Sequence, residues 1–181
     1  MVWEGGAARL LPIPIRFHCR SRKLDTIHAE IENFQNIVPF ADEATMVLKA
    51  HLLLEQSLWK FISARLSNDD LVTALRCKES EVRNGKALIQ LAEAIAARDE
   101  VPIDNGEKLW PALYAVNSLR NSLAHEIEPD RKKIEKYMRK VANTVCGEVT
   151  DNLNRDFYWA AILLLGYLGI SREALDVSDL E

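Results

Sequence analysis

The chain contains few cysteines and no recognisable metal-binding motif, and these absences exclude two classes of small protein. Only three cysteines occur in 181 residues (Cys19, Cys77 and Cys146), and their odd number and wide separation argue against a disulfide scaffold and a zinc site. The four histidines form no HExxH or similar spacing. We therefore expect reduced thiols, a cytoplasmic location, and neither a bound metal nor another cofactor.

The chain also lacks the segments that carry proteins into or across membranes. Its longest apolar run, FYWAAILLLGYLGI at 157–170, has 14 residues, whereas a helix that spans a bilayer needs roughly 20. The first twenty residues contain Gly5, Gly6, Pro12 and Pro14 and no continuous apolar stretch, which is untypical of a secretory signal. We expect an irregular N-terminal arm over 1–20, and a buried helix or a subunit interface at 157–170.

No segment alternates apolar and polar residues with a period of two, whereas helical periodicity occurs repeatedly. The hydrophobic share of 48% is sufficient for a core, and the length suits one domain. We predict an all-α bundle with one helical domain over 21–172 and an acidic tail over 173–181. The helices are expected at 24–36, 41–66, 71–77, 81–98, 105–125, 130–148 and 152–168.

A carboxylate interrupts the apolar face of the long helix at 41–66. At about 100° per residue, Glu55 falls in the middle of a line of apolar side chains, which are Leu48, Leu52, Trp59, Ile62 and Leu66. A buried carboxylate without a partner is costly, so Glu55 is expected to be paired. That pair is either purely structural or part of a functional site.

The helix at 105–125 carries the matching interruption. Arg120 falls on an apolar line formed by Leu109, Leu113, Val116 and Leu123. Because an arginine fork can hold a carboxylate and still offer donors elsewhere, we predict that Arg120 and Glu55 meet and are largely buried.

A different face of this helix is polar. Its members lie four residues apart and are Asn117, Asn121 and His125, flanked by Tyr114 and Ser118. Arg120 and His125 are separated by about 140° around a straight helix. Either the helix ends between them, or two copies of the chain build one site together. We predict a homodimer whose interface includes this helix.

The stretch LRNSLAHEIEP at 119–129, preceded by HLLLEQSLWKFI at 51–62, resembles the HEPN superfamily. The family pattern is an Arg, a polar residue directly after it, and a His four to six residues past the Arg, which Arg120, Asn121 and His125 match. The similarity covers roughly residues 24–150. It implies a HEPN-like up-and-down helical bundle, here with an extra C-terminal helix, that dimerises through the motif region.

The resemblance also implies a function. Many members are metal-independent endoribonucleases that act as toxins of toxin–antitoxin pairs or as phage-defence effectors. Others, such as relatives of the mannitol operon repressor, are catalytically inactive regulatory or RNA- and protein-binding modules. RNA and a cognate antitoxin or regulatory protein would be the partners. The implied catalytic residues are Arg120, Asn121 and His125, supported by Glu55 and Asn117. In toxins paired with a nucleotidyltransferase, a Tyr stands where this chain has Ile127.

The three motif residues suit RNA cleavage because RNA supplies its own nucleophile, the 2′-OH. His125 can transfer protons, since an unperturbed imidazole titrates near pH ~6.5. Arg120 can hold the scissile phosphate and Asn121 can orient it. The structural alternative is that His125 is only a cation favoured by the C-terminal helix dipole, and that Asn121 is an ordinary surface residue.

A basic segment follows the motif. RKKIEKYMRK at 131–140 has six basic residues and one acidic residue, in a chain with a net charge of −4. We predict that it binds RNA phosphates, with Tyr137 available for base stacking. A solvated helix face is the alternative interpretation. The predicted RNA-binding residues are Arg131, Lys132, Lys136, Arg139 and Lys140.

Overall fold

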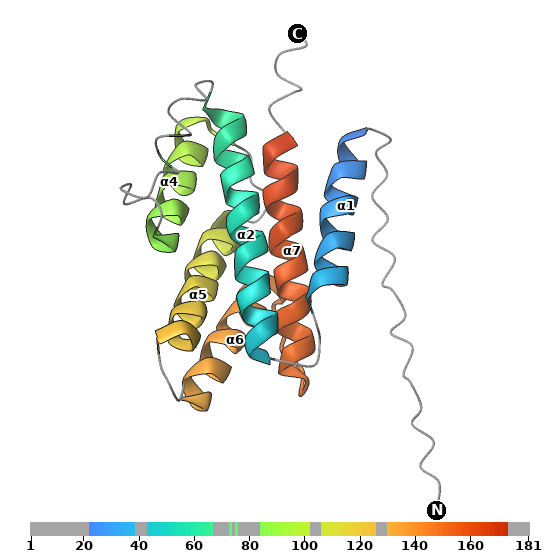
Figure 1. The fold of residues 1–181 in the computed structure, drawn as a ribbon, viewed down its shortest axis with the longest axis vertical. Coiled ribbons are helices and arrows are strands. Elements are labelled where there is room, and N and C mark those ends of the chain that lie inside the picture. The colour runs from blue at the N-terminus through green and yellow to red at the C-terminus, as the bar shows by residue number, and fades with distance from the viewer. Residues whose placement is uncertain are drawn as a thin grey trace, which may run out of the picture.

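The chain folds into helices packed around one core (Figure 1). The structure is a computed structural model that describes residues 22–38, 43–66, 73, 75, 84–101, 106–125 and 130–173, and the side chains of 22–26, 125 and 173 are not part of that description. The described residues form six helices and no strand, which confirms the all-α prediction. The helices are α1 (Arg22–Ile37), α2 (Glu43–Arg65), α4 (Gly85–Arg98), α5 (Gly106–His125), α6 (Arg131–Cys146) and α7 (Leu153–Glu173).

Several predicted segments lie outside the described residues. They are the arm at 1–20, the short helix at 71–77 apart from Thr73 and Leu75, and the acidic tail apart from Glu173. The other six predicted helices agree with the structure to within a few residues at each end.

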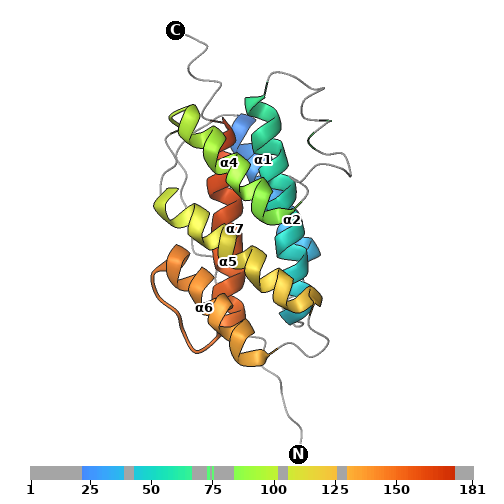
Figure 2. The same cartoon turned by 90° about the vertical axis from the view of Figure 1, so that its left-hand side faces the viewer.

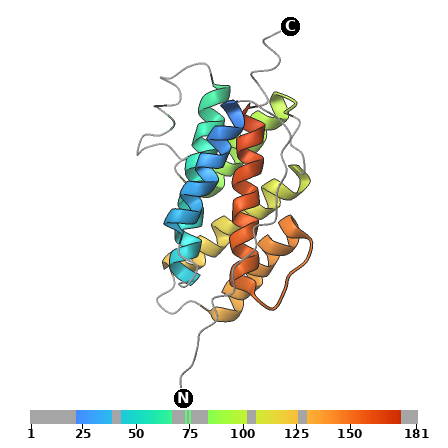
Figure 3. The ribbon, with the colours of Figure 1, turned by 90° about the vertical axis from the view of Figure 1, so that its right-hand side faces the viewer.

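Helix α7 occupies the centre of the bundle. It packs against α1, α2 and α6 and touches α5, while α4 packs on α2 and α5. Figure 2 shows α5 crossing α7 obliquely, and Figure 3 shows α1, α2 and α7 side by side from the opposite face. The prediction of a buried helix at 157–170 is confirmed. Its fully buried side chains include Phe157, Ala160, Ala161, Leu164 and Leu168.

None of the helices that the structure describes is long and apolar enough to cross a membrane. The apolar character of α7 is used instead in helix packing, since neighbouring helices cover most of its surface.

Polar residues define several helix ends. The Asn84 side chain accepts a hydrogen bond from Lys86 N at 3.1 Å and caps α4. Asp130 does the same for α6, accepting from Lys132 N at 3.0 Å. These contacts satisfy amide groups that the first turn of a helix leaves without a partner. At the other end of α6, Gly147 adopts a left-handed φ of 83°, which a residue with a side chain rarely tolerates.

The predicted inward face of α2 is correct toward its C-terminal end, where Ile62 is buried and Trp59 packs against the core, and wrong toward its N-terminal end. Leu48 and Leu52 are 36% and 56% exposed, whereas Val47, Leu54 and Phe61 are buried. The physical reason is that α2 contacts α7 on one side and α4 and α5 on another, so two adjoining faces are buried. The helix has more apolar residues than these faces need, and the periodicity alone selected the wrong subset toward the N-terminal end.

Two arginines that are largely shielded from solvent link neighbouring helices, and the first is Arg65 at the end of α2. Its side chain is only 2% exposed. Its Nη2 donates to the carbonyl oxygen of Ser171 in α7 at 2.6 Å, and its Nη1 lies 3.8 Å from Asp99 Oδ2, directly after α4. The guanidinium carbon lies 5.2 Å from the ring centroid of Phe61. Arg65 therefore joins the ends of three helices.

The second is Arg172 of α7, which shares a carboxylate with a lysine. Glu30 Oε1 of α1 accepts hydrogen bonds from Lys60 Nζ at 2.7 Å and from Arg172 Nη1 at 3.0 Å. Burial alone would raise the pKa of Glu30, but the hydrogen bonds and charges of Lys60 and Arg172 outweigh it and lower the pKa. The group connects α1 to α2 and α7.

We expect Glu30→Gln to lower the free energy of unfolding by about 1.5–3 kcal/mol at pH 7, the range for hydrogen bonds to charged groups. Because the folded-state pKa is lowered, this stability is present above the unfolded pKa of ~4.3 and is lost as the pH falls through the folded pKa. Urea unfolding at decreasing pH should show the two proteins converging. The control is Glu32→Gln, on an exposed carboxylate of the same helix. Equal unfolding midpoints for both variants at pH 7 would contradict the prediction.

Candidate functional site at the end of α5

Arg120 and Asn121 lie in the C-terminal half of α5, and their side chains contact each other. Arg120 Nη1 donates a hydrogen bond to Asn121 Oδ1 at 3.1 Å, and both residues are partly exposed. The sequence placed them on different faces of the helix, but their length lets them meet at its surface. The contact uses one of the five guanidinium N–H donors.

His125 is the last residue of α5, and the helix continues through it. Its side chain and residues 126–129 lie outside the described part of the chain. One alternative from the sequence, that the helix ends between Arg120 and His125, is therefore wrong. The offset of about 140° between the two positions applies to an unbroken helix.

Glu55 and Arg120 are less buried than predicted, since both residues are partly exposed. Their predicted hydrogen bond stays a prediction. Glu55 Oε2 lies 3.8 Å from Nδ1 of His51, one turn earlier on α2. The Glu55 side chain is 31% exposed, because α2 is rotated relative to the prediction and places it at the rim of the core.

Asn117, predicted on a polar face, is buried where α2, α4 and α5 meet. It is 7% exposed, and His51 beside it is 9% exposed. The two side chains converge on Gly85, the first residue of α4. A Cβ on Gly85 would collide with Asn117 Oδ1 and lie 3.5 Å from His51 Nε2. A side chain at position 85 would therefore force the Asn117 side chain to move.

His51 and Gly85 were missed as site residues by the sequence reasoning. The only signal for His51 was its place one turn before Glu55, and no local pattern indicated that Gly85 touches α5. Burial lowers the pKa of His51 and the charge of Arg120 lowers it further, while a hydrogen bond with Asn117 partly opposes this. His51 is therefore neutral at neutral pH. A pocket of about 10 Å³, room for one water molecule, opens beside His51, Glu55 and Gly85.

Tyr114 and Ser118, which flank the motif in the sequence, have structural contacts. Tyr114 Oη donates to Glu93 Oε2 of α4 at 2.8 Å, and Ser118 Oγ donates to the Tyr114 carbonyl oxygen at 2.9 Å. Burial, together with the hydrogen bond and charge of Glu93, raises the pKa of Tyr114 to about 12. The Tyr114 hydroxyl therefore serves to link α5 to α4.

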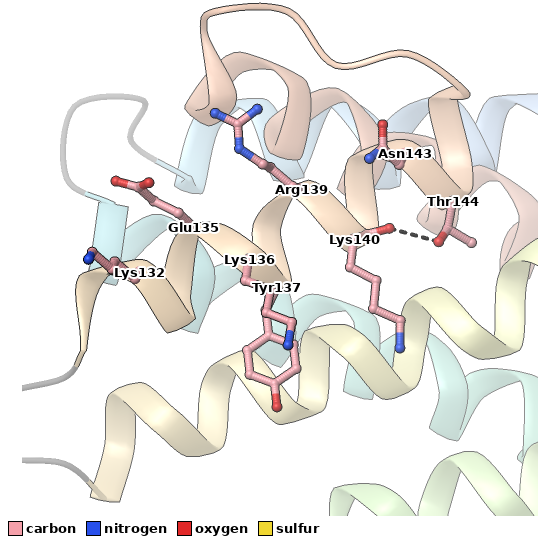
Figure 4. A pocket seen from close by; sticks show the side chains of 8 residues that line it. All are labelled: Lys132, Glu135, Lys136, Tyr137, Arg139, Lys140, Asn143 and Thr144. Carbon is pink, nitrogen blue, oxygen red and sulfur yellow. Dashed lines mark hydrogen bonds between the residues drawn. The ribbon is translucent and has the colours of Figure 1, made fainter.

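The basic helix α6 lines an open groove of about 810 Å³ (Figure 4). Four of the five predicted RNA-binding residues line it, namely Lys132, Lys136, Arg139 and Lys140, together with Glu135, Tyr137, Asn143 and Thr144. The four cationic residues are exposed. Figure 4 shows Tyr137 and Lys140 pointing from α6 toward α5, and Arg139 pointing away from it.

Arg131, the fifth predicted residue, lies apart from this groove. Its Nε is 3.4 Å from Glu135 Oε1, and it lines a neighbouring hollow with Glu43 and Asp151. Its charge is therefore partly balanced by carboxylates. The pairing also occupies Glu135, which is the one acidic residue among those lining the groove.

The motif and the groove lie at the same end of the bundle. Helices α5 and α6 pack against each other, and residues 126–129 join the end of α5 to the start of α6 (Figure 2). In such a helical hairpin, the last turns of α5 lie beside the first turns of α6. Arg120 and Asn121 are therefore near the level of Glu135 and Lys136 along the helical hairpin.

Within the described ranges, no group of three or more His, Cys, Asp or Glu side chains is arranged to hold a metal ion. No protein-family profile matches the chain, and no curated protein or solved structure is significantly similar to it.

Proposed function

We propose that the protein is a metal-independent endoribonuclease of HEPN type that acts as a toxin–antitoxin or phage-defence effector. In this proposal the helices form a HEPN-like up-and-down bundle with α7 as the extra C-terminal helix. The observation that carries it is the Arg120–Asn121 pair at the end of α5, one hairpin turn away from the cationic groove on α6. The groove is suited to a phosphate chain, and the pair is suited to one phosphate within it.

The reaction follows from these groups. His125 removes the proton from the 2′-OH, whose oxygen attacks the adjacent phosphorus as the bond to the 5′-oxygen breaks. Arg120 stabilises the negative charge that develops on the phosphate, and Asn121 holds the guanidinium in place. The proton that His125 has taken then goes to the leaving 5′-oxygen, directly or through a water molecule, so that His125 returns to its starting state. The products carry a 2′,3′-cyclic phosphate and a 5′-hydroxyl, and DNA is not a substrate because it lacks the 2′-OH.

Incubation of the purified protein with mixed cellular RNA in EDTA tests this function. We expect cleavage, with cyclic-phosphate and 5′-hydroxyl ends, because the nucleophile belongs to the RNA and needs no metal activation. A DNA of matching sequence is the control and should stay intact. Cleavage only after magnesium is added would contradict the proposal. Complete absence of cleavage would favour the alternative, a catalytically inactive HEPN protein with a regulatory or binding role.

We expect a homodimer that includes the end of α5. An unbroken helix separates Arg120 and His125 by about 140°, so two chains related by a two-fold axis would bring complementary residues together. The exposed leucines of α2, Leu48 and Leu52, offer apolar surface for such an interface. Light scattering at micromolar concentration should give about twice the chain mass of 20.5 kDa. Leu52→Glu should shift the protein toward the monomer, and a wild-type monomer would contradict the prediction.

We expect RNA binding to weaken with salt according to the four exposed cations of the groove. For single strands, the logarithm of the binding constant should fall with the logarithm of salt concentration at a slope of about −0.7 per phosphate contact, or roughly −3 in total. Lys136→Ala should make the slope less steep by about 0.7, measured by fluorescence anisotropy with His125→Ala protein to prevent cleavage. Lys86→Ala, an exposed lysine on α4, is the matched control. Equal slopes for both variants would place the RNA elsewhere.

A further inference from the structure

The buried side chain of His51, on α2, connects this helix to α5, which carries Arg120 and Asn121. His51 and Asn117 are both more than nine-tenths buried, and both converge on the side-chain-free start of α4 at Gly85. Buried polar groups are retained at low energetic cost only when they are paired, and these two pair with each other across a helix interface.

The position of Gly85 shows which edges of the two side chains adjoin each other. Asn117 Oδ1 and His51 Nε2 both lie beside the position that a Gly85 Cβ would take. Because an amide oxygen only accepts hydrogen bonds, Nε2–H is the donor of a hydrogen bond between these two atoms. The other ring nitrogen, Nδ1, faces Glu55 at 3.8 Å.

Asn117 is one helical turn before Arg120, and the two positions differ by about 60° around α5. A contact that fixes the position of Asn117 therefore also fixes the helical turn that carries Arg120. The charged groups facing His51 in the described residues are Glu55 of α2 and Arg120 of α5, while α4 contributes only its N-terminal end.

We propose that His51 is a positioning residue of the Arg120 site. Its Nε2–H holds the Asn117 turn of α5 against α2, and its Nδ1 faces Glu55. The inference deepens the proposed function and rests on it, since it assigns His51 a role in placing the phosphate-binding arginine. Protonation of Nδ1 would add a second cation beside Arg120 and a donor toward Glu55. The environment of Arg120 thus depends on the protonation state of His51.

The chain contains a natural control for this role. His28 and Glu32 of α1 have the same spacing as His51 and Glu55, and their atoms approach to 3.6 Å, but their side chains are 76% and 63% exposed. His28 therefore has the same local pairing without the contact to the motif helix.

The first test needs no RNA. In ¹⁵N-labelled protein, the Nε–Hε signal of Arg120 should shift with pH as the His51 ring titrates. His51→Gln can still donate from the position of Nε2 but does not titrate, so most of this shift should disappear. His28→Gln should behave as wild type. An Arg120 signal that titrates identically in wild type and His51→Gln would overturn the proposal.

The second test uses cleavage. His51→Leu removes the donor at similar volume and should lower kcat/KM by about 10–100-fold, as loss of a supporting hydrogen bond does elsewhere. His51→Gln should recover most of that loss, which a role in packing alone does not predict. His28→Gln should be unchanged. Wild-type activity in His51→Leu would overturn the proposal, whereas a wild type that cleaves no RNA would refute the nuclease function and leave the spectroscopic test to decide on His51.

Discussion

Replacing His125 by alanine should lower the rate of RNA cleavage by about 10²–10⁴-fold, the usual contribution of a positioned acid or base. The fold should survive, because His125 is the last residue of α5 and ends the helix without interrupting it. Arg120→Ala should cost about 10²–10³-fold, as removal of one transition-state donor does. Arg120→Lys should recover little, since a lysine cannot reproduce the fork that contacts Asn121. The measurement is single-turnover cleavage of a labelled RNA in EDTA.

Mixing the two inactive variants tests whether two chains share one site. If each site combines Arg120 of one chain with His125 of the other, a mixed dimer of Arg120→Ala and His125→Ala chains has one intact site and one that lacks both residues. Random exchange makes half of the dimers mixed, so about a quarter of wild-type activity should return. If each chain builds its own site, mixing restores nothing. Retained cleavage by His125→Ala alone would remove the proposed chemistry.

Replacing Arg65 by alanine should lower the free energy of unfolding by about 3 kcal/mol, the largest loss of stability that we predict. The change removes a charged hydrogen bond to the Ser171 carbonyl, the ion pair with Asp99, and the packing of the guanidinium against Phe61. For a chain of this length, a loss of that size lowers the melting temperature by roughly 6–12 °C.

Two further variants separate charge from packing at this position. Arg65→Met should recover part of the stability, because an apolar side chain of similar size fills the site without a buried charge. Arg98→Ala is the matched control: Arg98 also pairs with Asp99, at 2.6 Å, but its side chain is 57% exposed, so little change is expected. If Arg65→Ala and Arg98→Ala melt at the same temperature, the importance assigned to burial of Arg65 is wrong.

The helices were predictable from the sequence because their signals are local. Periodic apolar residues are read within one segment, and a cap such as Asp130 lies next to the helix that it begins. The rotation of α2 was not predictable in this way. Leu52 and Leu54 are equally apolar, and only the positions of α4, α5 and α7 determine which of them is buried.

The candidate site was likewise predictable only where its signals are local. The grouping of Arg120 with Asn121, and of four cations on α6, followed from residues close together in the sequence. The burial of Asn117 was not predictable, because it depends on contacts between distant segments. Asn117 lies beside the glycine that begins α4, and nothing near Asn117 in the sequence records that glycine.

The central position of α7 has a consequence for synthesis on the ribosome. The helices that pack on it, α1, α2, α5 and α6, all precede it in the chain, so each must wait for α7 before one of its apolar faces is covered. The contact of α1 with α7 closes a loop of more than a hundred residues, and such long-range closure slows folding. The nascent chain therefore exposes apolar surface until residue 173 has emerged, and it should depend on chaperones during that interval more than a bundle built only from neighbouring hairpins.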